Sequence, residues 1–169
     1  TTNQTDSKKM NNIQKIFLCG LSFLLMLLVG CGESSVYHDV KVVDEKGWHK
    51  DSIVSFEYDA TDTMTTYDLI IDIRHSSDYS YKNFWLFVRS EAPDGKSYTD
   101  TLECVLADNY GNWIGKSTGS LYELPVMFMP MTKFPRTGKF RFDLYQGMRD
   151  DLLQGIHEMG FRIEKSKVE

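Results

Sequence analysis

The chain lacks the short motifs that mark common enzyme classes. It has no Gly-x-Ser-x-Gly nucleophile elbow and no glycine-rich phosphate loop. Its four histidines, at positions 38, 49, 75 and 157, show no metal-ligand spacing, so a zinc site would need long-range convergence. Acidic residues are plentiful, and a glycosidase-like carboxylate pair is therefore not excluded. We predict no catalytic residue, no metal and no cofactor.

An excess of basic residues is also missing. From Cys31 onward the sequence holds 16 Lys and Arg against 23 Asp and Glu, a formal net charge of −7. Such a charge disfavours nucleic acid as a partner, because binding to phosphates depends on basic side chains. Cysteines are few as well, with only three in the chain, at positions 19, 31 and 104.

The one long apolar run ends just before Cys31. Residues 1–9 are polar and patternless, and Met10 resembles a natural start, so we interpret 1–9 as a disordered extension or an over-called gene start. Lys15 precedes the apolar residues 16–29. These span about 21 Å as a helix, short of the about 30 Å of a bilayer core. Residues 10–30 therefore predict a lipoprotein signal peptide rather than a permanent span.

Cys31 is the predicted lipid attachment site. It follows a leucine at −3 and a glycine at −1, the residue types that lipoprotein processing requires. Two or more acyl chains on the thiol hold a protein stably to a membrane. Gly32, where an aspartate would favour inner-membrane retention, favours the outer membrane, and the periplasmic and surface-facing sides stay open. The alternative is an ordinary signal peptide that leaves Cys31 as a plain thiol.

The rest of the sequence predicts an all-β domain. Residues 31–36 suggest a short linker, 37–165 a single domain and 166–169 a frayed tail. Apolar and polar residues alternate with a period of two in most runs, with turn residues between them. We expect a two-sheet antiparallel β-sandwich of about eight strands, jelly-roll-like or immunoglobulin-like, with a closed barrel as the second choice. The expected strands cover 36–42, 54–59, 67–74, 84–88, 98–106, 121–129, 139–145 and 159–164. A tight turn is expected at 92–96, because Pro93 presets φ, Asp94 caps the turn and Gly95 adopts a positive φ.

Several local predictions can be tested against a structure. Residues 84–88 are apolar on both phases, which indicates a central strand covered on two sides. Pro125 indicates an edge strand or a broken one, because proline removes a ladder donor. Residues 148–153 suit one helical turn, closed by Gly155. With Cys19 in the signal and Cys31 acylated, Cys104 has no disulfide partner, and we expect it to be buried and unreactive.

Two stretches are candidates for an interaction surface. Trp48, His49, Lys50 and Asp51 place an aromatic ring within a polar cluster just before a strand; the alternative is that Trp48 plugs the end of the sandwich. Met127, Phe128 and Met129 lie in a run that is apolar on both phases; the alternative is a buried strand.

Two further clusters leave alternatives open. A sugar-binding aromatic platform and plain sheet core both suit the four rings of Tyr79, Tyr81, Trp85 and Phe87. Residues 108–112 faintly suggest calcium but lack a terminal bidentate acid, which favours an Asx-rich turn. We expect Trp113, in the same loop, to fold back over the core.

A set of segments spread along the mature sequence matches a known pattern in the same order. These segments are 48–52, 100–104, 106–108 with Gly111, Trp113 and Gly115, 134–135 with Gly138, 146–149, 155–156 and 162–165. On these segments the mature sequence resembles the gliding motility lipoprotein GldH family of Bacteroidetes nearly throughout. The resemblance implies a cell-envelope lipoprotein that acts with other lipoproteins and gliding motility proteins, and it supplies no catalytic residue. It places the lipidated cysteine at Cys31, and it leaves open whether Gln146 and Arg149 form a contact site or a buried corner.

The predicted function is therefore that of a membrane-anchored, non-catalytic interaction component of the gliding motility machinery. Two alternatives remain. One is a surface glycan-binding lipoprotein, and the other is an Asp/Glu-dependent hydrolase.

Overall fold

A computed structural model describes residues 35–167. The predicted signal peptide and the predicted lipid site Cys31 lie outside this range, so both stay predictions. Within it no helix is formed, and hence none that is long and apolar enough to cross a membrane.

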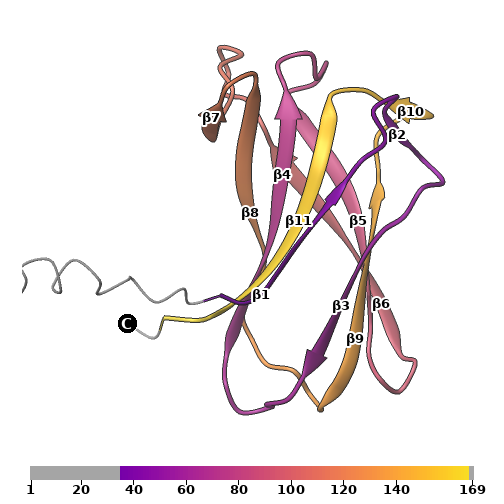
Figure 1. Cartoon of the computed structure of the whole chain (residues 1–169), viewed down its shortest axis with the longest axis vertical. Helices are drawn as coiled ribbons and strands as arrows, with labels where there is room; N and C mark the ends of the chain where they lie inside the picture. The colour runs from indigo at the N-terminus through magenta and orange to yellow at the C-terminus, as the bar shows by residue number, and fades with distance from the viewer. Residues whose placement is uncertain (1–34, 168–169) are drawn as a thin grey trace, which may run out of the picture. The chain divides into compact units, whose positions relative to one another are not determined.

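Eight long antiparallel strands and three short ones make up the described chain (Figure 1). One sheet has the order β1-β11-β4-β8-β7 and the other the order β3-β9-β5-β6, and β2 pairs with β10 in a small third sheet. The strands are β1 (Ser35–Val42), β2 (Trp48–His49), β3 (Val54–Ala60), β4 (Tyr67–Ser76), β5 (Asn83–Glu91), β6 (Ser97–Val105), β7 (Lys116–Thr118), β8 (Leu121–Thr132), β9 (Gly138–Gln146), β10 (Leu152–Leu153) and β11 (Ile156–Lys165).

The strand pairing is that of a jelly roll. β1 pairs with β11, β3 with β9, β4 with β8 and β5 with β6, so the long strands pair from the two ends of the chain inward, like one long hairpin. Rolling that hairpin places its pairs alternately in the two sheets. The immunoglobulin-like alternative pairs strands in a different order. The predicted all-β sandwich is thus confirmed, in its jelly-roll form.

The turn at residues 92–96 lies at the midpoint of this hairpin. The Ala92 backbone N–H donates to the Lys96 carbonyl at 2.8 Å, and the Gly95 N–H donates to the Ala92 carbonyl at 2.9 Å. Gly95 has φ +80°, a conformation that glycine adopts without steric cost. The proline, aspartate and glycine of this segment therefore form the tight turn that the sequence predicts.

Aromatic rings join the two sheets across the core. Phe161 of β11 is fully buried and stacks on Phe142 of β9, with ring centroids 4.5 Å apart, and on Phe56 of β3 at 5.6 Å. Tyr37 of β1 meets Phe161 edge-on at 6.5 Å. Period-two alternation directs these rings inward, so the contact between the sheets follows from the pattern of the strands.

The segment 148–153 is not a helical turn, which corrects the sequence prediction. Gln146 is only 4% exposed, and its side chain satisfies the turn instead. Its Oε1 accepts from the Met148 backbone N–H at 2.8 Å, and its Nε2 donates to the Asp150 carbonyl at 2.6 Å. Residues 152–153 then pair with β2 as β10. Competition from a side-chain amide replaces the helical hydrogen bonds.

The prediction for residues 84–88 was half right. β5 is central in its sheet, between β9 and β6, and Phe84, Leu86 and Val88 are fully buried. The outward phase is not covered, since Trp85 is half-buried and Phe87 is exposed. The outward phase of β5 therefore places two aromatic side chains on the outer face of the sheet.

β8 behaves as a partial edge strand. β7 covers only its first residues, through the pairs Lys116–Glu123, Ser117–Tyr122 and Thr118–Leu121. Beyond Glu123, β8 pairs only with β4 among residues 35–167. Pro125 lies in this open part, and proline in a sheet is typical of such edge positions because it lacks a ladder donor.

The two ends of the described chain differ from the expected boundaries. β1 begins at Ser35, inside the expected linker. Ser166, in the expected frayed tail, donates from its backbone N–H to the Thr66 carbonyl at 3.0 Å and from its hydroxyl to Asp68 at 2.7 Å. The domain therefore takes in a few residues more at each end than predicted.

Candidate functional site

The segments that contain β2 and β10 form one end of the sandwich together with two further loops, and we call this end the loop end. It comprises residues 44–53, 77–82, 106–115 and 147–155, at the top of Figure 1. Backbone hydrogen bonds join these segments, for example from the Lys50 N–H to the Asp151 carbonyl at 2.9 Å and from the Leu106 N–H to the Lys82 carbonyl at 2.8 Å.

Trp48 is a core residue rather than a contact residue. Its ring is 1% exposed and packs edge-on against Phe84 at 5.9 Å. The indole N–H donates to the Ser52 carbonyl at 2.9 Å. The candidate surface therefore loses Trp48, and the alternative interpretation, in which the ring plugs the end of the sandwich, describes its position.

The polar residues that follow Trp48 are exposed on the loop end. His49, Lys50 and Asp51 all reach solvent. The Lys50 Nζ lies 2.6 Å from the Asp151 carboxylate, and this hydrogen bond raises the pKa of Lys50 and lowers the pKa of Asp151. An exposed pair of this kind adds little stability. It does tie the β2 segment to the loop after β9.

Gln146 and Arg149, three residues apart, have different roles. Gln146 is the buried corner described above. Arg149 is exposed and forms no ion pair with any described residue. The structure therefore brings Arg149 to the same end as His49, Lys50 and Asp51, while Gln146 holds the loop that carries it.

The methionine-rich stretch lies elsewhere. Met127 is 47% exposed, whereas Phe128 and Met129 are half-buried. Met127 pairs with Ile70, six residues along β4 from Ser76, whose partner Leu121 lies near the loop end. At about 3.3 Å per residue, six residues span about 20 Å. Met127, Phe128 and Met129 are thus not part of the loop-end surface.

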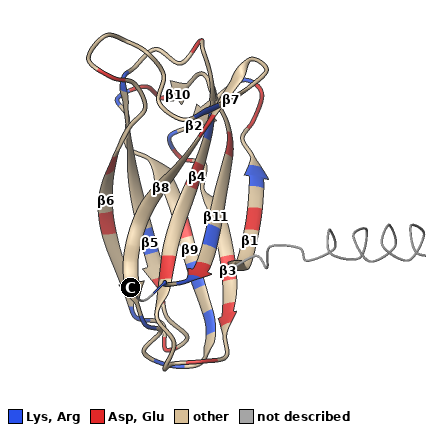
Figure 2. Ribbon diagram, turned by 90° about the vertical axis from the view of Figure 1, so that its left-hand side faces the viewer, with Lys and Arg blue, Asp and Glu red and all other residues tan. Residues whose placement is uncertain are grey.

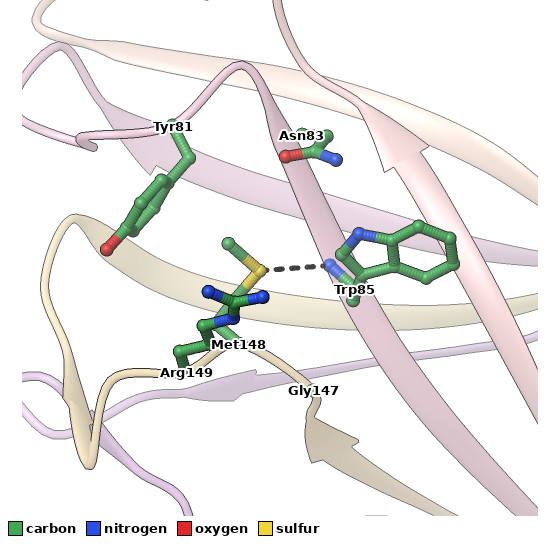
Figure 3. Close-up of a pocket in the computed structure, with 6 residues that line it drawn as sticks. All are labelled: Tyr81, Asn83, Trp85, Gly147, Met148 and Arg149. Atoms are coloured by element: carbon green, nitrogen blue, oxygen red, sulfur yellow. Dashed lines mark hydrogen bonds between the residues drawn. The ribbon is translucent and has the colours of Figure 1, made fainter.

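A hollow of about 490 Å³ opens at the loop end, beside the start of β5. Figure 3 shows Tyr81 and Trp85 on opposite sides of Met148 and Arg149. The volume lies within the range of about 300–1,000 Å³ that is usual for ligand pockets. The residues that line it are Tyr81, Asn83, Trp85, Gly147, Met148 and Arg149.

Hydrogen bonds between β5 and the segment after β9 hold the residues that line this hollow in place. The Gly147 N–H donates to the Trp85 carbonyl at 2.7 Å, and the Trp85 N–H donates to the Met148 sulfur at 3.4 Å. A Cβ on Gly147 would lie 3.1 Å from both the Trp85 carbonyl oxygen and the Phe87 ring, so glycine permits this approach. The Tyr81 hydroxyl donates to Asp150 at 2.7 Å, which raises the pKa of Tyr81.

The residues singled out from the sequence include only some of those that line this hollow. Tyr81 and Trp85 belong to the four rings considered as a sugar platform, but Tyr79 is buried, and Phe87 does not line the hollow. Asn83 and Met148 were missed. Met148 joins Trp85 only because β9 and β5 are neighbours, and no local pattern reports that pairing.

Two buried titratable groups lie behind the loop end. His75 is fully buried between Trp113, at a centroid distance of 4.7 Å, and Tyr122, at 5.5 Å. Burial lowers the pKa of His75, and its Nε2 has no hydrogen-bond partner among the described residues. Cys104 is buried on β6 as predicted, and burial raises the pKa of its thiol to about 12.

The 108–112 loop is an Asx turn held by Asp108. The Asp108 carboxylate accepts from the backbone N–H of Tyr110 at 2.8 Å and from Asn112, through its backbone at 2.9 Å and its side chain at 2.9 Å. The side-chain bond from Asn112 is the largest cause of the lowered pKa of Asp108. Within residues 35–167, no group of three or more His, Cys, Asp or Glu residues is placed to hold a metal ion.

Ion pairs cover the outer face of the β1-β11-β4-β8 sheet. Arg162 of β11 contacts both carboxylate oxygens of Asp72 on β4, at 2.7 and 2.9 Å, and also contacts Glu164 at 2.7 Å. Arg74 lies 2.8 Å from Glu158. Figure 2 shows acidic and basic segments on the neighbouring strands β4 and β11. These ion pairs make the β4 and β11 part of this face polar.

Comparison with known proteins gives consistent matches. A family model described as GldH lipoprotein matches residues 35–163. The chain is 37% identical over 151 residues to "Gliding motility lipoprotein GldH homolog" of Christiangramia forsetii, covering 85% of this chain and 92% of that protein. It is 31% identical over 147 residues to "Gliding motility lipoprotein GldH" of Flavobacterium johnsoniae, covering 83% and 91%. Among solved structures, the infectious bursal disease virus VP2 subviral particle matches with a TM-score of 0.31 at 9% identity, over 76% of this chain and 30% of that one.

Proposed function

This chain belongs to the GldH lipoprotein family, and from that premise we propose that it is a lipid-anchored, non-catalytic interaction component of the gliding motility machinery. The observation that carries the proposal is the family match, which spans nearly the whole described sandwich, loop end included. The proposed partners are other envelope lipoproteins or gliding motility proteins, and the proposed anchor is a lipid on Cys31 in the outer membrane.

The proposed anchor lies close in sequence to the start of β1. Cys31 precedes Ser35 by four residues, which span at most about 14 Å when extended. Ser35 begins β1, and the eight residues of this strand carry the chain about 26 Å toward the loop end. In this proposal the start of β1 at Ser35 is the part of the sandwich nearest in sequence to the anchor, and β1 leads from there toward the loop end.

The loop end suits contact with a protein partner. His49, Lys50, Asp51 and Arg149 are exposed there on short loops that backbone pairing holds in place. A preordered surface loses less entropy on binding than a flexible one. The Met127 region of β8, about 20 Å away along the sheet, offers a separate apolar surface, and it stays a second prediction.

Site-specific photo-crosslinking in living cells of the native bacterium tests the contact role. A photoreactive residue at Lys50 on the loop end is compared with one at Lys96, an exposed lysine in the 92–96 turn at the other end. We expect Lys50 to crosslink to a defined envelope protein and Lys96 not to. Equal crosslinking from both positions, or from neither, would contradict a loop-end contact.

The anchor has its own test. Wild-type cells fed labelled palmitate should label this chain and keep it in the membrane fraction, and Cys31→Ser should remove the label and release the protein. Cells carrying Cys31→Ser should also spread less on agar. An unlabelled wild-type chain, or a Cys31→Ser variant that fractionates unchanged, would refute lipid anchoring at this cysteine.

A further inference from the structure

Two adjoining hollows at the loop end share a common wall. The first, of about 490 Å³, contains Tyr81, Trp85 and Arg149, and the second, of about 420 Å³, lies on the other side of Tyr81 and Asn83. We propose that together they form one binding site for a neutral oligosaccharide, with a sugar ring in each hollow. This inference goes beyond the proposed interaction role and does not depend on it. The second hollow is lined by Ser80, Tyr81, Lys82, Asn83, Glu103, Val105, Ala107 and Asn109.

The aromatic rings supply the surface on which a sugar stacks. A pyranose has one face of C–H groups, which are slightly positive, and the face of an aromatic ring is slightly negative. Tyr81 is 36% exposed, and its ring is held by the bond to Asp150 at 2.7 Å and by edge contact with Tyr79 at 5.8 Å. Trp85 lies across the first hollow from it (Figure 3). The Tyr81 ring is thus held in place before a ligand arrives, and the backbone of Trp85 is fixed by its hydrogen bonds with Gly147 and Met148.

The polar groups between the rings suit hydroxyl groups. A sugar hydroxyl both donates and accepts, so it needs partners of both kinds. The Asn83 side-chain Nδ2 donates to Glu103 at 2.7 Å, and the side-chain oxygen Oδ1 accepts no hydrogen bond from residues 35–167. Arg149 brings five N–H donors with no ion-pair partner in the same range. Both donors and acceptors are therefore present among the side chains that line the two hollows.

The charge balance favours a neutral ligand. Glu103 and Asp150 hydrogen-bond to side chains that line the hollows, and Arg149 and Lys82 are themselves lining residues. Two negative and two positive side chains leave no net charge to attract a polyanion. A purely apolar ligand would leave these polar groups without partners, which costs free energy. Neutral sugars satisfy the polar groups and the rings together.

The shared wall sets the expected ligand length. Tyr81 and Asn83 line both hollows, so one sugar ring fills only part of the site. We therefore expect a disaccharide or longer chain to bind at least tenfold more tightly than its monosaccharide.

The test uses the full lipidated chain in detergent micelles. The probes are neutral gluco-, manno- and galacto-oligosaccharides of one to six rings, in both linkage configurations, with binding measured by isothermal titration calorimetry. We expect at least one probe to bind and Tyr81→Ala and Trp85→Ala each to weaken it tenfold or more. Tyr98→Ala, an exposed ring on β6 that does not line the hollows, is the matched control and should change affinity less than twofold.

Urea denaturation of each variant separates loss of binding from loss of folding. If Trp85→Ala unfolds, Tyr81→Phe carries the test, because it keeps the ring and removes only the hydroxyl bound to Asp150. Its affinity should fall about threefold, and an unchanged affinity there would overturn the proposal. So would a panel in which no probe binds at millimolar concentration, or binding that survives Tyr81→Ala. Palmitate labelling and Lys50 crosslinking of Tyr81→Ala should match the wild type, so a failure here leaves the proposed function standing.

Discussion

Replacing Trp48 with alanine should destabilise the fold, because the ring is part of the core. Trp48 is 1% exposed, contacts Phe84 and donates its indole N–H to the Ser52 carbonyl. Truncating a buried tryptophan costs about 3–5 kcal/mol, and the lost hydrogen bond adds about 1 kcal/mol. A total of about 4–6 kcal/mol is a large share of the about 5–15 kcal/mol that stabilises a typical domain.

Urea denaturation, followed by tryptophan fluorescence and circular dichroism, measures this cost. With a urea m-value of about 2 kcal/mol/M, a loss of about 4 kcal/mol lowers the midpoint by about 2 M. Trp48→Phe keeps a ring in the same space and should cost only about 1–2 kcal/mol.

Trp85→Ala is the matched control, since this tryptophan is half-buried on the outer face of the same sandwich. Its truncation should cost about 1 kcal/mol, because less apolar area returns to water. If Trp48→Ala cost under about 1.5 kcal/mol, or no more than Trp85→Ala, the ring would not be plugging the core, and its assignment as a contact residue would return.

Three further predictions concern His75, Cys104 and Gly155, at or near the loop end. The folded-state pKa of His75 lies below its ordinary value of about 6.5, so the unfolded chain binds more protons in acid. Stability should be fully present above about pH 6.5 and fall as the pH drops through that value, and His75→Phe should flatten this dependence in urea titrations from pH 5 to 8. Cys104, with a thiol pKa of about 12, should react with a maleimide on the hour scale in the native protein and within minutes in 6 M guanidinium; equal rates would contradict its burial. Gly155 has φ +85°, and a Cβ there would lie 2.7 Å from the Tyr79 backbone, so Gly155→Ala should cost about 2 kcal/mol or more in thermal unfolding, and a neutral result would refute the close approach.

Membership in the family and the proposed sugar site beside Tyr81 rest on different observations. Membership in the GldH lipoprotein family rests on matches over most of the chain. It says nothing about the hollows beside Tyr81, whose chemistry comes from the side chains that line them. Function on a shared fold depends on such sites rather than on the fold itself.

Local pattern in the sequence determined the elements of this protein. Period-two alternation predicted the strands, because a strand turns successive side chains to opposite faces whatever its neighbours are. The turn at 92–96 was predicted for an equally local reason, since proline and glycine restrict or extend φ at their own positions. The burial of Cys104 also followed, from its place between Leu102 and Leu106 on one phase of a strand.

Tertiary structure decided how those elements combine. Periodicity reports which side chains share a face, but not which strands are neighbours, so a jelly roll and an immunoglobulin-like order could not be distinguished. For the same reason, periodicity could not decide whether Trp48 packs against Phe84 in the core. It also did not predict the turn that Gln146 holds or the contact of Met148 with Trp85. Each depends on residues that lie far apart in sequence or on a side chain that competes with the backbone, and only the folded chain brings them together.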